Sequence, residues 1–306
     1  ELPKIDAPAK TYSGSVAILG TPNVGKSTLL NRIVGKRVSI VSDKPQTTRS
    51  QVMGVYTRGE RQIIFVDTPG IGKPLGRLST HLNRVAESTG IDADLLLWVV
   101  DARRGVKEDD RQILEKIAGS NRPLFAVFNK MDTTSNEAIM SVVADLNETK
   151  KISEFFPVSA FTGENVDELI NALLAALPEG PLLFGAEVRT DQSDETVAAE
   201  FIREQVFLNA AQEIPYQVGV QVESFKTVED GVVAVEAVVL VEKDNHRKIL
   251  IGKGGEIVKR LRTNAQRRLR DHLDKKVRLS LWIKVKKELD KADAEREIVK
   301  LRKRWF

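Results

Sequence analysis

The segment GTPNVGKST at residues 20–28 constrains the fold more than any other part of this sequence. It matches G-x-x-x-x-G-K-[ST], follows the apolar run 15–20 directly and opens a helical pattern over 26–35. In this context the loop amides converge on phosphate oxygens at the positive end of a helix. A chance match in a chain of 306 residues is expected on the order of once in a hundred sequences. We therefore predict a phosphate-binding loop and not an ordinary glycine-rich turn.

Each residue type in this loop has an expected role. Gly20 and Gly25 permit the tight turn. Lys26 is expected to bridge the β- and γ-phosphates, and Ser27 to place its hydroxyl on a magnesium ion. The other residues that we expect at the nucleotide are Asn23, Val24 and Thr28.

The first 177 residues alternate short apolar runs with helical patterns. Strands are predicted at 15–20, 52–58, 62–67, 94–101, 123–129 and 155–160. Helices are predicted at 26–35, 77–89, 109–119, 136–147 and 165–177. Near-continuous apolar strands separated by helices indicate an α/β domain with a mostly parallel sheet covered on both faces. The second and third strands are close enough for an antiparallel edge hairpin, and ligands of such sheets bind beyond the carboxyl ends of the strands.

DTPG at 67–70 follows the third predicted strand. Asp67 is placed to hold magnesium, and the amide of Gly70 to contact the γ-phosphate. An aspartate before Pro-Gly is also common turn chemistry. Its position downstream of a phosphate loop favours the magnesium role.

NKMD at 129–132 follows the strand at 123–129 and predicts which base is bound. The carboxylate of Asp132 can accept two hydrogen bonds from the ring N–H and the amino group of guanine, which adenine cannot supply. Asn129 is expected to contact the base edge or to tie loops together, and the stem of Lys130 to lie over the ring. Ser159 and Ala160 end the last strand, where a backbone amide would meet the guanine oxygen. A P-loop ATPase is disfavoured by Asp132.

The ordered set GTPNVGKS, TTR, DTPG, NKMD and SA resembles the translation-factor-related GTPases, and most closely the Era family. The resemblance implies that Thr48, with Thr47 as the alternative, joins the magnesium ion when the γ-phosphate is present. Ile71 stands where many GTPases have a water-orienting Gln. We therefore expect slow intrinsic hydrolysis with Lys26, Thr48, Gly70 and Asn23 as the catalytic set. Asn23 either holds a potassium ion, as in related GTPases, or fixes the loop by a hydrogen bond.

Charge is distributed unevenly along the chain. Residues 241–306 contain 22 Lys and Arg against 10 Asp and Glu, whereas residues 1–240 contain 25 against 33. A basic end on an acidic body suggests a polyanion partner, with a solvated basic helix face as the alternative. No apolar run approaches the roughly 18 residues of a membrane span. The absence of cysteine fits a reducing compartment.

A second domain is expected after a Pro- and Gly-rich break. We place the first domain at 10–180, a linker at 181–194, and the second domain at 195–306. The second domain has the order α-β-β-α-α-β, and its Gly252-Lys253-Gly254-Gly255 matches the GXXG loop of KH domains, which clamps about four nucleotides of single-stranded backbone. It therefore resembles a smaller α+β type II KH domain. The expected RNA-binding residues are Ile251, Gly252, Lys253, Gly254, Gly255, Lys259 and Arg260.

The Era resemblance also implies a biological setting. It implies a monomeric, cytoplasmic GTPase that uses Mg²⁺ with GTP and GDP and assists assembly of the small (30S) ribosomal subunit. Its partner would be the 3′ end of small-subunit rRNA, and some peripheral contact with the inner face of the cell membrane is also implied. Two rivals stay open: a membrane-associated signalling GTPase, and an RNA-binding scaffold in which nucleotide is only a structural ligand.

Overall fold

The computed structural model describes residues 10–42, 52–67, 93–210 and 214–286. Its backbone contacts divide the chain into two compact units, Glu1–Ser39 with Gln51–Asp191 and Ile40–Ser50 with Gln192–Phe306. The predicted helix at 77–89 and the predicted site residues Thr48 and Gly70 lie outside the described residues. Thr47 and Ile71 do so as well.

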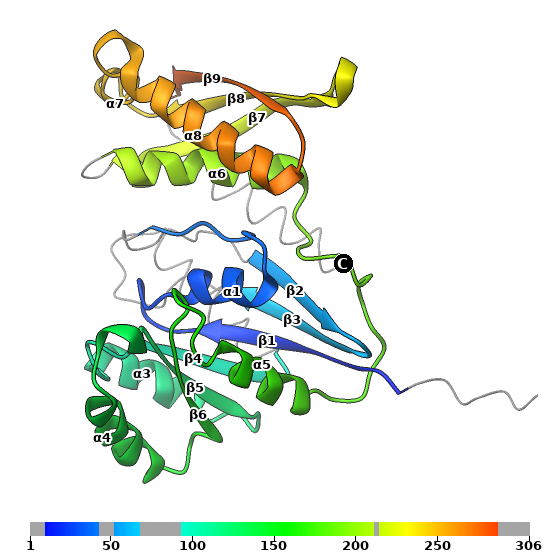
Figure 1. Ribbon diagram of the computed structural model, residues 1–306. Coiled ribbons are helices and arrows are strands. Elements are labelled where there is room, and N and C mark those ends of the chain that lie inside the picture. The colour runs from blue at the N-terminus through cyan, green and yellow to red at the C-terminus, as the bar shows by residue number, and fades with distance from the viewer. Residues whose placement is uncertain (1–9, 43–51, 68–92, 211–213, 287–306) are drawn as a thin grey trace, which may run out of the picture. The chain divides into compact units, whose positions relative to one another are not determined.

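The first unit is built on a six-stranded sheet with the order β2-β3-β1-β4-β5-β6 (Figure 1). The strands are β1 (Tyr12–Leu19), β2 (Val52–Arg58), β3 (Arg61–Asp67), β4 (Leu95–Asp101), β5 (Leu124–Asn129) and β6 (Glu154–Val158). The edge strand β2 runs antiparallel to its neighbour β3, and the other described pairs are parallel. The expected parallel sheet with an antiparallel edge hairpin is therefore present.

Helices cover both faces of this sheet, as Figure 1 shows. They are α1 (Lys26–Val34), α3 (Glu108–Ile117), α4 (Asn136–Asn147) and α5 (Val166–Ala175). Because successive strand residues point to opposite faces, β4 contributes to two cores. Its Leu97 and Val99 pack with α1 and α5, whereas its Leu96 and Trp98 pack with α3 and α4. A strand buried on both faces explains the uninterrupted apolar sequence of β4.

Most of the predicted linker at 181–194 belongs to the first unit. The side chain of Gln62 on β3 is fully buried and accepts hydrogen bonds from the amides of Leu183 (2.8 Å) and Phe184 (2.9 Å). Farther along, the carbonyl of Arg189 accepts a 2.8 Å hydrogen bond from the amide of Val55 on β2. The segment thus runs along the sheet edge as far as Asp191, the last residue of the first unit.

The second unit has the expected α-β-β-α-α-β order. Its elements are α6 (Asp194–Asn209), β7 (Val218–Thr227), β8 (Val233–Val241), α7 (Asp244–Ile251), α8 (Glu256–Leu273) and β9 (Val277–Val285). The central strand β8 pairs antiparallel with β7 and parallel with β9. Short 3₁₀ turns lie at Ile214–Gln217, Glu229–Gly231 and Lys253–Gly255.

One core holds the second unit together. The long helices α6 and α8 contact each other and pack with the sheet (Figure 1). Leu261, Ala265 and Leu269 recur on α8 at intervals of four residues and are fully buried, so they form its apolar stripe. Among the described residues, no helix is long and apolar enough to cross a membrane.

Candidate functional site

The phosphate loop lies between β1 and α1. Its two glycines are required because other atoms of the protein lie too close to leave room for a side chain. Gly20 has φ 152°, and a Cβ there would lie 2.3 Å from the carbonyl oxygen of Val99. Gly25 has φ 99°, and a Cβ there would lie 2.2 Å from Nδ2 of Asn129. The loop can therefore adopt this conformation only with glycine at both positions. Thr28 lies in the first turn of α1.

Lys26 is held inside the loop. Its Nζ donates to the carbonyl oxygens of Gly20 (3.0 Å) and Thr21 (2.9 Å). Burial lowers the pKa of Lys26 to about 8, although the charges of Asp67 and Asp110 act in the opposite direction. A buried ammonium that donates to neutral carbonyls is well prepared to bind phosphate oxygens.

Asp67, at the end of β3, accepts two hydroxyl hydrogen bonds on one oxygen. Its Oδ2 accepts from Oγ of Ser27 at 2.6 Å and from Oγ of Ser39 at 2.9 Å. Burial raises the pKa of Asp67, while the charge of Lys26 and the two serine hydrogen bonds lower it. The other oxygen, Oδ1, is buried and has no hydrogen-bond partner among the described residues. This unpaired oxygen beside a serine hydroxyl suits Mg²⁺, which prefers hard oxygen ligands.

Ser39 was missed by the sequence analysis. The side chain of Asn31, on α1, holds the backbone of Ser39 by hydrogen bonds. Asn31 Oδ1 accepts from the amides of Val38 (2.8 Å) and Ser39 (2.9 Å), and its Nδ2 donates to the carbonyl of Ser39 (2.7 Å). The asparagine therefore places the Ser39 hydroxyl on Asp67. No local pattern in the sequence marks either residue.

Asn129 ties three loops together, which was one of its two expected roles. Its Nδ2 donates to the carbonyl of Val24 in the phosphate loop at 2.8 Å. Its Oδ1 accepts from the amide of Ala160 at 2.9 Å. Asn129 is buried, so it joins the ends of β5 and β6 to the phosphate loop from within.

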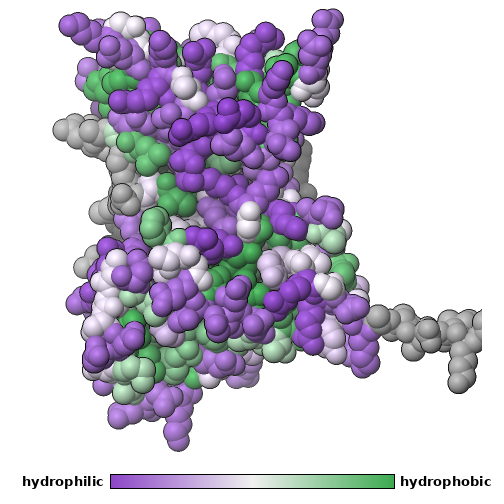
Figure 2. Space-filling model, in the orientation of Figure 1, coloured by the Kyte–Doolittle hydropathy of each residue, from purple (hydrophilic) through white to green (hydrophobic). Residues whose placement is uncertain are grey.

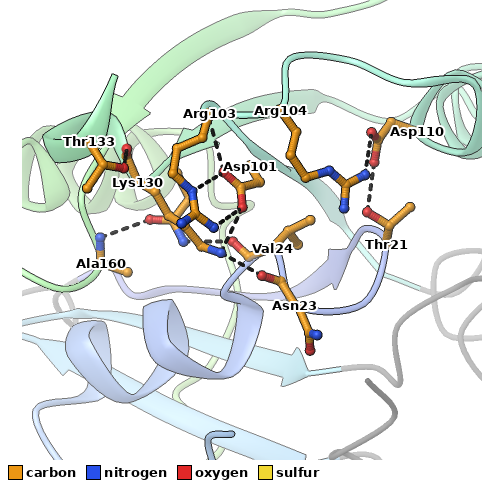
Figure 3. A network of polar contacts seen from close by, with 11 residues as sticks. Thr21, Asn23, Val24, Asp101, Arg103, Arg104, Asp110, Lys130, Thr133 and Ala160 are labelled. Atoms are coloured by element: carbon orange, nitrogen blue, oxygen red, sulfur yellow. Dashed lines mark hydrogen bonds and ion pairs between the residues drawn. The ribbon is translucent and has the colours of Figure 1, made fainter. Parts of the chain in front are cut away.

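Lys130 and Asp132 follow at the carboxyl end of β5. Lys130 Nζ donates to the carbonyl of Asn23 at 2.7 Å and to Asp101 Oδ2 at 2.8 Å (Figure 3). Asp132 is exposed within the 3₁₀ turn Met131–Thr133. Its side chain is therefore accessible to a ligand.

The backbone amides near the end of β6 have partners within the protein. The amide of Ser159 donates to the carbonyl of Glu164 at 3.0 Å, and that of Ala160 donates to Asn129, as described above. The expected contact with the guanine oxygen therefore requires one of these hydrogen bonds to be shared or replaced. Arg32 of α1 secures this turn by donating to the carbonyls of Ala160 and Phe161.

A second buried carboxylate supports the phosphate loop from α3. Asp110 Oδ1 accepts a 2.8 Å hydrogen bond from the hydroxyl of Thr21, and its Oδ2 accepts from the amide of Lys107 at 3.1 Å. Arg104 lies 3.7 Å from the same carboxylate. Figure 3 shows Asp110 beside Thr21, and Asp101 farther along the phosphate loop, near Asn23 and Val24. Sequence reasoning assigned neither of them to the site.

In the second unit, the GKGG loop joins α7 to α8 with left-handed glycines. The φ angles of Gly252, Gly254 and Gly255 are 75°, 61° and 80°. A Cβ at Gly252 would lie 2.7 Å from Ile257, whereas a Cβ at Gly254 would meet nothing within 4 Å. The loop conformation therefore depends on glycine, and Gly254 leaves open space for another backbone to approach.

Basic side chains surround this loop. Lys253, Lys259 and Arg260 are exposed, and Ile251 is half-buried beside them. Figure 2 shows hydrophilic side chains gathered over α8 on the face turned to the viewer. The predicted RNA-binding residues thus lie close together in the chain, at the end of α7, in the loop and in the first turns of α8.

Fold and site together define a P-loop GTPase followed by a KH module. The sequence matches the family described as 50S ribosome-binding GTPase over residues 15–130 and the KH domain family over residues 213–289. It is 39% identical over 281 residues to GTPase Era of Ruminiclostridium cellulolyticum, covering 92% of this chain and 94% of that protein. It is 41% identical over 277 residues to GTPase Era of Geobacter metallireducens, covering 90% and 93%.

Solved structures agree with these relatives. A crystal structure of Era in complex with MgGDPNP and nucleotides 1506–1542 of 16S ribosomal RNA matches with a TM-score of 0.86 and 35% identity, covering 91% of this chain and 95% of that one. A variant of Aquifex aeolicus Era bound to GDP·AlF₄⁻ matches with the same TM-score, identity and coverage. The chain belongs to the Era family of GTPases, and it is a GTP hydrolase.

Proposed function

We propose that this chain is a GTP-controlled factor that binds single-stranded RNA at the 3′ end of small-subunit rRNA and acts in assembly of the small ribosomal subunit. The observation that carries the proposal is the exposed, basic GKGG loop on the same chain as the nucleotide site. GXXG loops of KH domains clamp single-stranded backbone. The similar Era crystal structure with a 16S rRNA segment supports the choice of RNA.

In the nucleotide site, Ser27 and Asp67 would hold Mg²⁺, with Thr48 joining when GTP is bound. The ion would supply positive charge beside the β- and γ-phosphate oxygens. The similar Era structure contains MgGDPNP, which supports Mg²⁺ with GTP and GDP as the ligands. Lys26 binds the phosphates and Asp132 selects guanine.

Hydrolysis in this proposal is slow because Ile71 cannot orient the attacking water. Lys26 and the loop amides stabilise charge that develops on the transferred phosphate, and Gly70 contacts the γ-phosphate. We include potassium as an activator held by Asn23. Equal GTP turnover in sodium and potassium salts would leave Asn23 only its loop-fixing role.

Binding of the two ligands is linked in this proposal. GTP favours one state of the switch residues Thr48 and Gly70, and that state binds RNA with a different affinity from the GDP-bound state. The protein would act as a monomer in the cytoplasm, with peripheral contact to the inner face of the membrane. Equal RNA affinity with GDP and with a non-hydrolysable GTP analogue would contradict the linkage.

RNA binding is tested by changing the loop without disturbing the fold. Gly254→Asp adds a charge and a Cβ where nothing lies within 4 Å, and aspartate tolerates the left-handed conformation better than most residues. Gly231→Asp is the matched control, because Gly231 has φ 70° and equally open space in the β7–β8 turn of the same unit. We expect Gly254→Asp to weaken binding of a single-stranded 3′-end rRNA oligonucleotide at least about tenfold, with Gly231→Asp near wild type.

The same variants separate the rival functions. An equal loss of RNA affinity in both variants would contradict a role of the GKGG loop in RNA binding. Wild-type RNA affinity in Gly254→Asp would contradict it as well. Salt-sensitive binding to anionic vesicles that Gly254→Asp leaves unchanged, without RNA binding, would favour a membrane-associated GTPase. The other rival, an RNA-binding scaffold with nucleotide as a structural ligand only, does not agree with a GTP hydrolase.

A further inference from the structure

Asp101 is a buried carboxylate at the carboxyl end of β4, and none of the roles assigned above includes it. The parallel register places Asp101 opposite Asn129, the first residue of the predicted guanine loop. The next residue, Ala102, donates its amide to the carbonyl of Asn129 at 2.8 Å. Asp101 is only 3% exposed. It therefore lies beside the base-binding loop and is shielded from bulk water.

Two cations bind the carboxylate of Asp101 (Figure 3). Its Oδ1 accepts from the amide and Nε of Arg103 at 3.1 Å and 3.0 Å. Its Oδ2 accepts from Nη2 of Arg103 at 2.6 Å and from Nζ of Lys130 at 2.8 Å. Burial alone would raise the pKa of Asp101, but the hydrogen bonds and charges of Arg103 and Lys130 outweigh it and lower the pKa to about 2. The group is a fixed negative charge at neutral pH.

Lys130 connects this carboxylate to the phosphate loop. Its ammonium also donates to the carbonyl of Asn23 at 2.7 Å. Both Lys130 and Asn23 have left-handed backbone conformations, with φ 69° and 65°. That region is unfavourable for residues with a Cβ, so the contacts around the ammonium help to hold both loops in place.

We propose that Asp101 is a positioning residue of the guanine site and acts through Lys130. It holds the lysine ammonium at one end, so that the lysine stem is already laid out where the guanine ring would pack. Without Asp101, the ammonium loses its charged partner and keeps the neutral carbonyl of Asn23, so the long side chain regains its other rotamers. The inference rests on the proposed role of Lys130 at the nucleotide.

A double-mutant cycle tests whether Asp101 acts through Lys130. The variants Asp101→Asn, Lys130→Met and the combination of both are prepared in the full chain. Release of a fluorescent GDP is followed after mixing with excess unlabelled GDP, and thermal unfolding is measured without nucleotide. We expect each single variant to release GDP about tenfold faster than wild type. We expect the double variant to stay within about twofold of Lys130→Met alone.

Asp110→Asn is the matched control. Asp110 is equally buried and also supports the phosphate loop, but through Thr21 and not through Lys130. Its effect on GDP release should therefore multiply with that of Lys130→Met. If Asp101→Asn does not fold, Asp101→Glu replaces it in the cycle. That variant keeps the charge but displaces it, and we expect about threefold faster release that again disappears in the Lys130→Met background.

Two results would overturn the role of Asp101. One is a double variant whose effect equals the product of the two single effects, as for Asp110. The other is GDP release within about twofold of wild type in Asp101→Asn together with a lowered melting temperature, which indicates a purely structural group. Either result would still be compatible with GDP binding by the wild-type chain. A wild-type chain that binds no GDP would instead overturn the proposed function itself.

Discussion

The hydroxyl of Ser39 donates a 2.9 Å hydrogen bond to the carboxylate of Asp67. It meets the same oxygen as the hydroxyl of Ser27, so two serines from different segments fix one orientation of the carboxylate. The buried second oxygen is thereby left for a cation. This relationship makes Ser39 part of the proposed magnesium site, although it lies outside every nucleotide-binding motif.

Ser39→Ala should weaken the response to magnesium. Hydrogen bonds to charged groups contribute about 1.5–3 kcal/mol, so the Mg²⁺ concentration for half-maximal GTP hydrolysis should rise roughly tenfold. A magnesium titration of GTP turnover measures this. Ser120→Ala is the control, because that hydroxyl donates to the carbonyl of Ile117 at the end of α3. An unchanged magnesium titration for Ser39→Ala would show that Ser27 alone orients Asp67.

Nucleotide affinity should fall at alkaline pH because of Lys26. In the free protein the pKa of Lys26 is lowered to about 8, and bound phosphates favour the charged form. Binding above pH 8 must therefore take up a proton, and GDP affinity should drop about tenfold per pH unit there. Calorimetry in buffers of different ionisation enthalpy detects that proton uptake. A flat affinity between pH 7 and pH 9.5 would be inconsistent with a charged Lys26 at the phosphates.

Gly25→Ala should abolish nucleotide binding while leaving the chain folded. The new Cβ would displace the side chain of Asn129, which lies 2.2 Å from its position. Gly35→Ala is the control at the other end of α1, where φ is 71° and nothing lies within 4 Å. That variant should lose only about 1 kcal/mol of stability from backbone strain. Equal GDP affinity in the two variants would argue against the close contact of Asn129 with the loop.

Gln62→Leu should release the segment that runs along the sheet edge. The variant leaves the amides of Leu183 and Phe184 without their acceptor, which costs about 1–3 kcal/mol for each group that stays buried. Urea unfolding should show a loss of at least about 2 kcal/mol, and limited proteolysis should become faster near residue 183. Gln112→Leu, on the exposed face of α3, is the control. Unchanged proteolysis would mean that this segment is held by other contacts.

Within the described residues, the sequence predicted the strands, the helices and the glycine-rich loops, because these depend on local patterns. The buried strand β4 was visible as an apolar run, and the phosphate loop as glycines and a lysine at fixed spacing. Both glycine-rich loops carry the left-handed angles that their composition predicts. The order of elements in the second unit followed from the same reasoning.

Positions that depend on contacts distant in sequence could not be predicted in this way. Asp101 and Lys130 are 29 residues apart, and Thr21 and Asp110 are 89 apart. The first pair forms because the parallel strands β4 and β5 end side by side. The second forms because the phosphate loop after β1 lies against the first turn of α3. The Pro and Gly content of residues 181–194 predicts a linker. It does not indicate that Leu183 donates a hydrogen bond to Gln62, which is 121 residues away in the sequence.

The most direct test of the account compares purine nucleotides on wild type and Asp132→Asn by calorimetry. Wild type should bind GDP at least about 10⁴-fold more tightly than ADP, since ADP leaves the Asp132 carboxylate unpaired. Asp132→Asn should weaken GDP binding at least about 100-fold and shift preference toward XDP, whose second ring carbonyl can accept from the new amide. ADP binding as tight as GDP in wild type, or an unchanged purine preference in the variant, would contradict guanine recognition by Asp132.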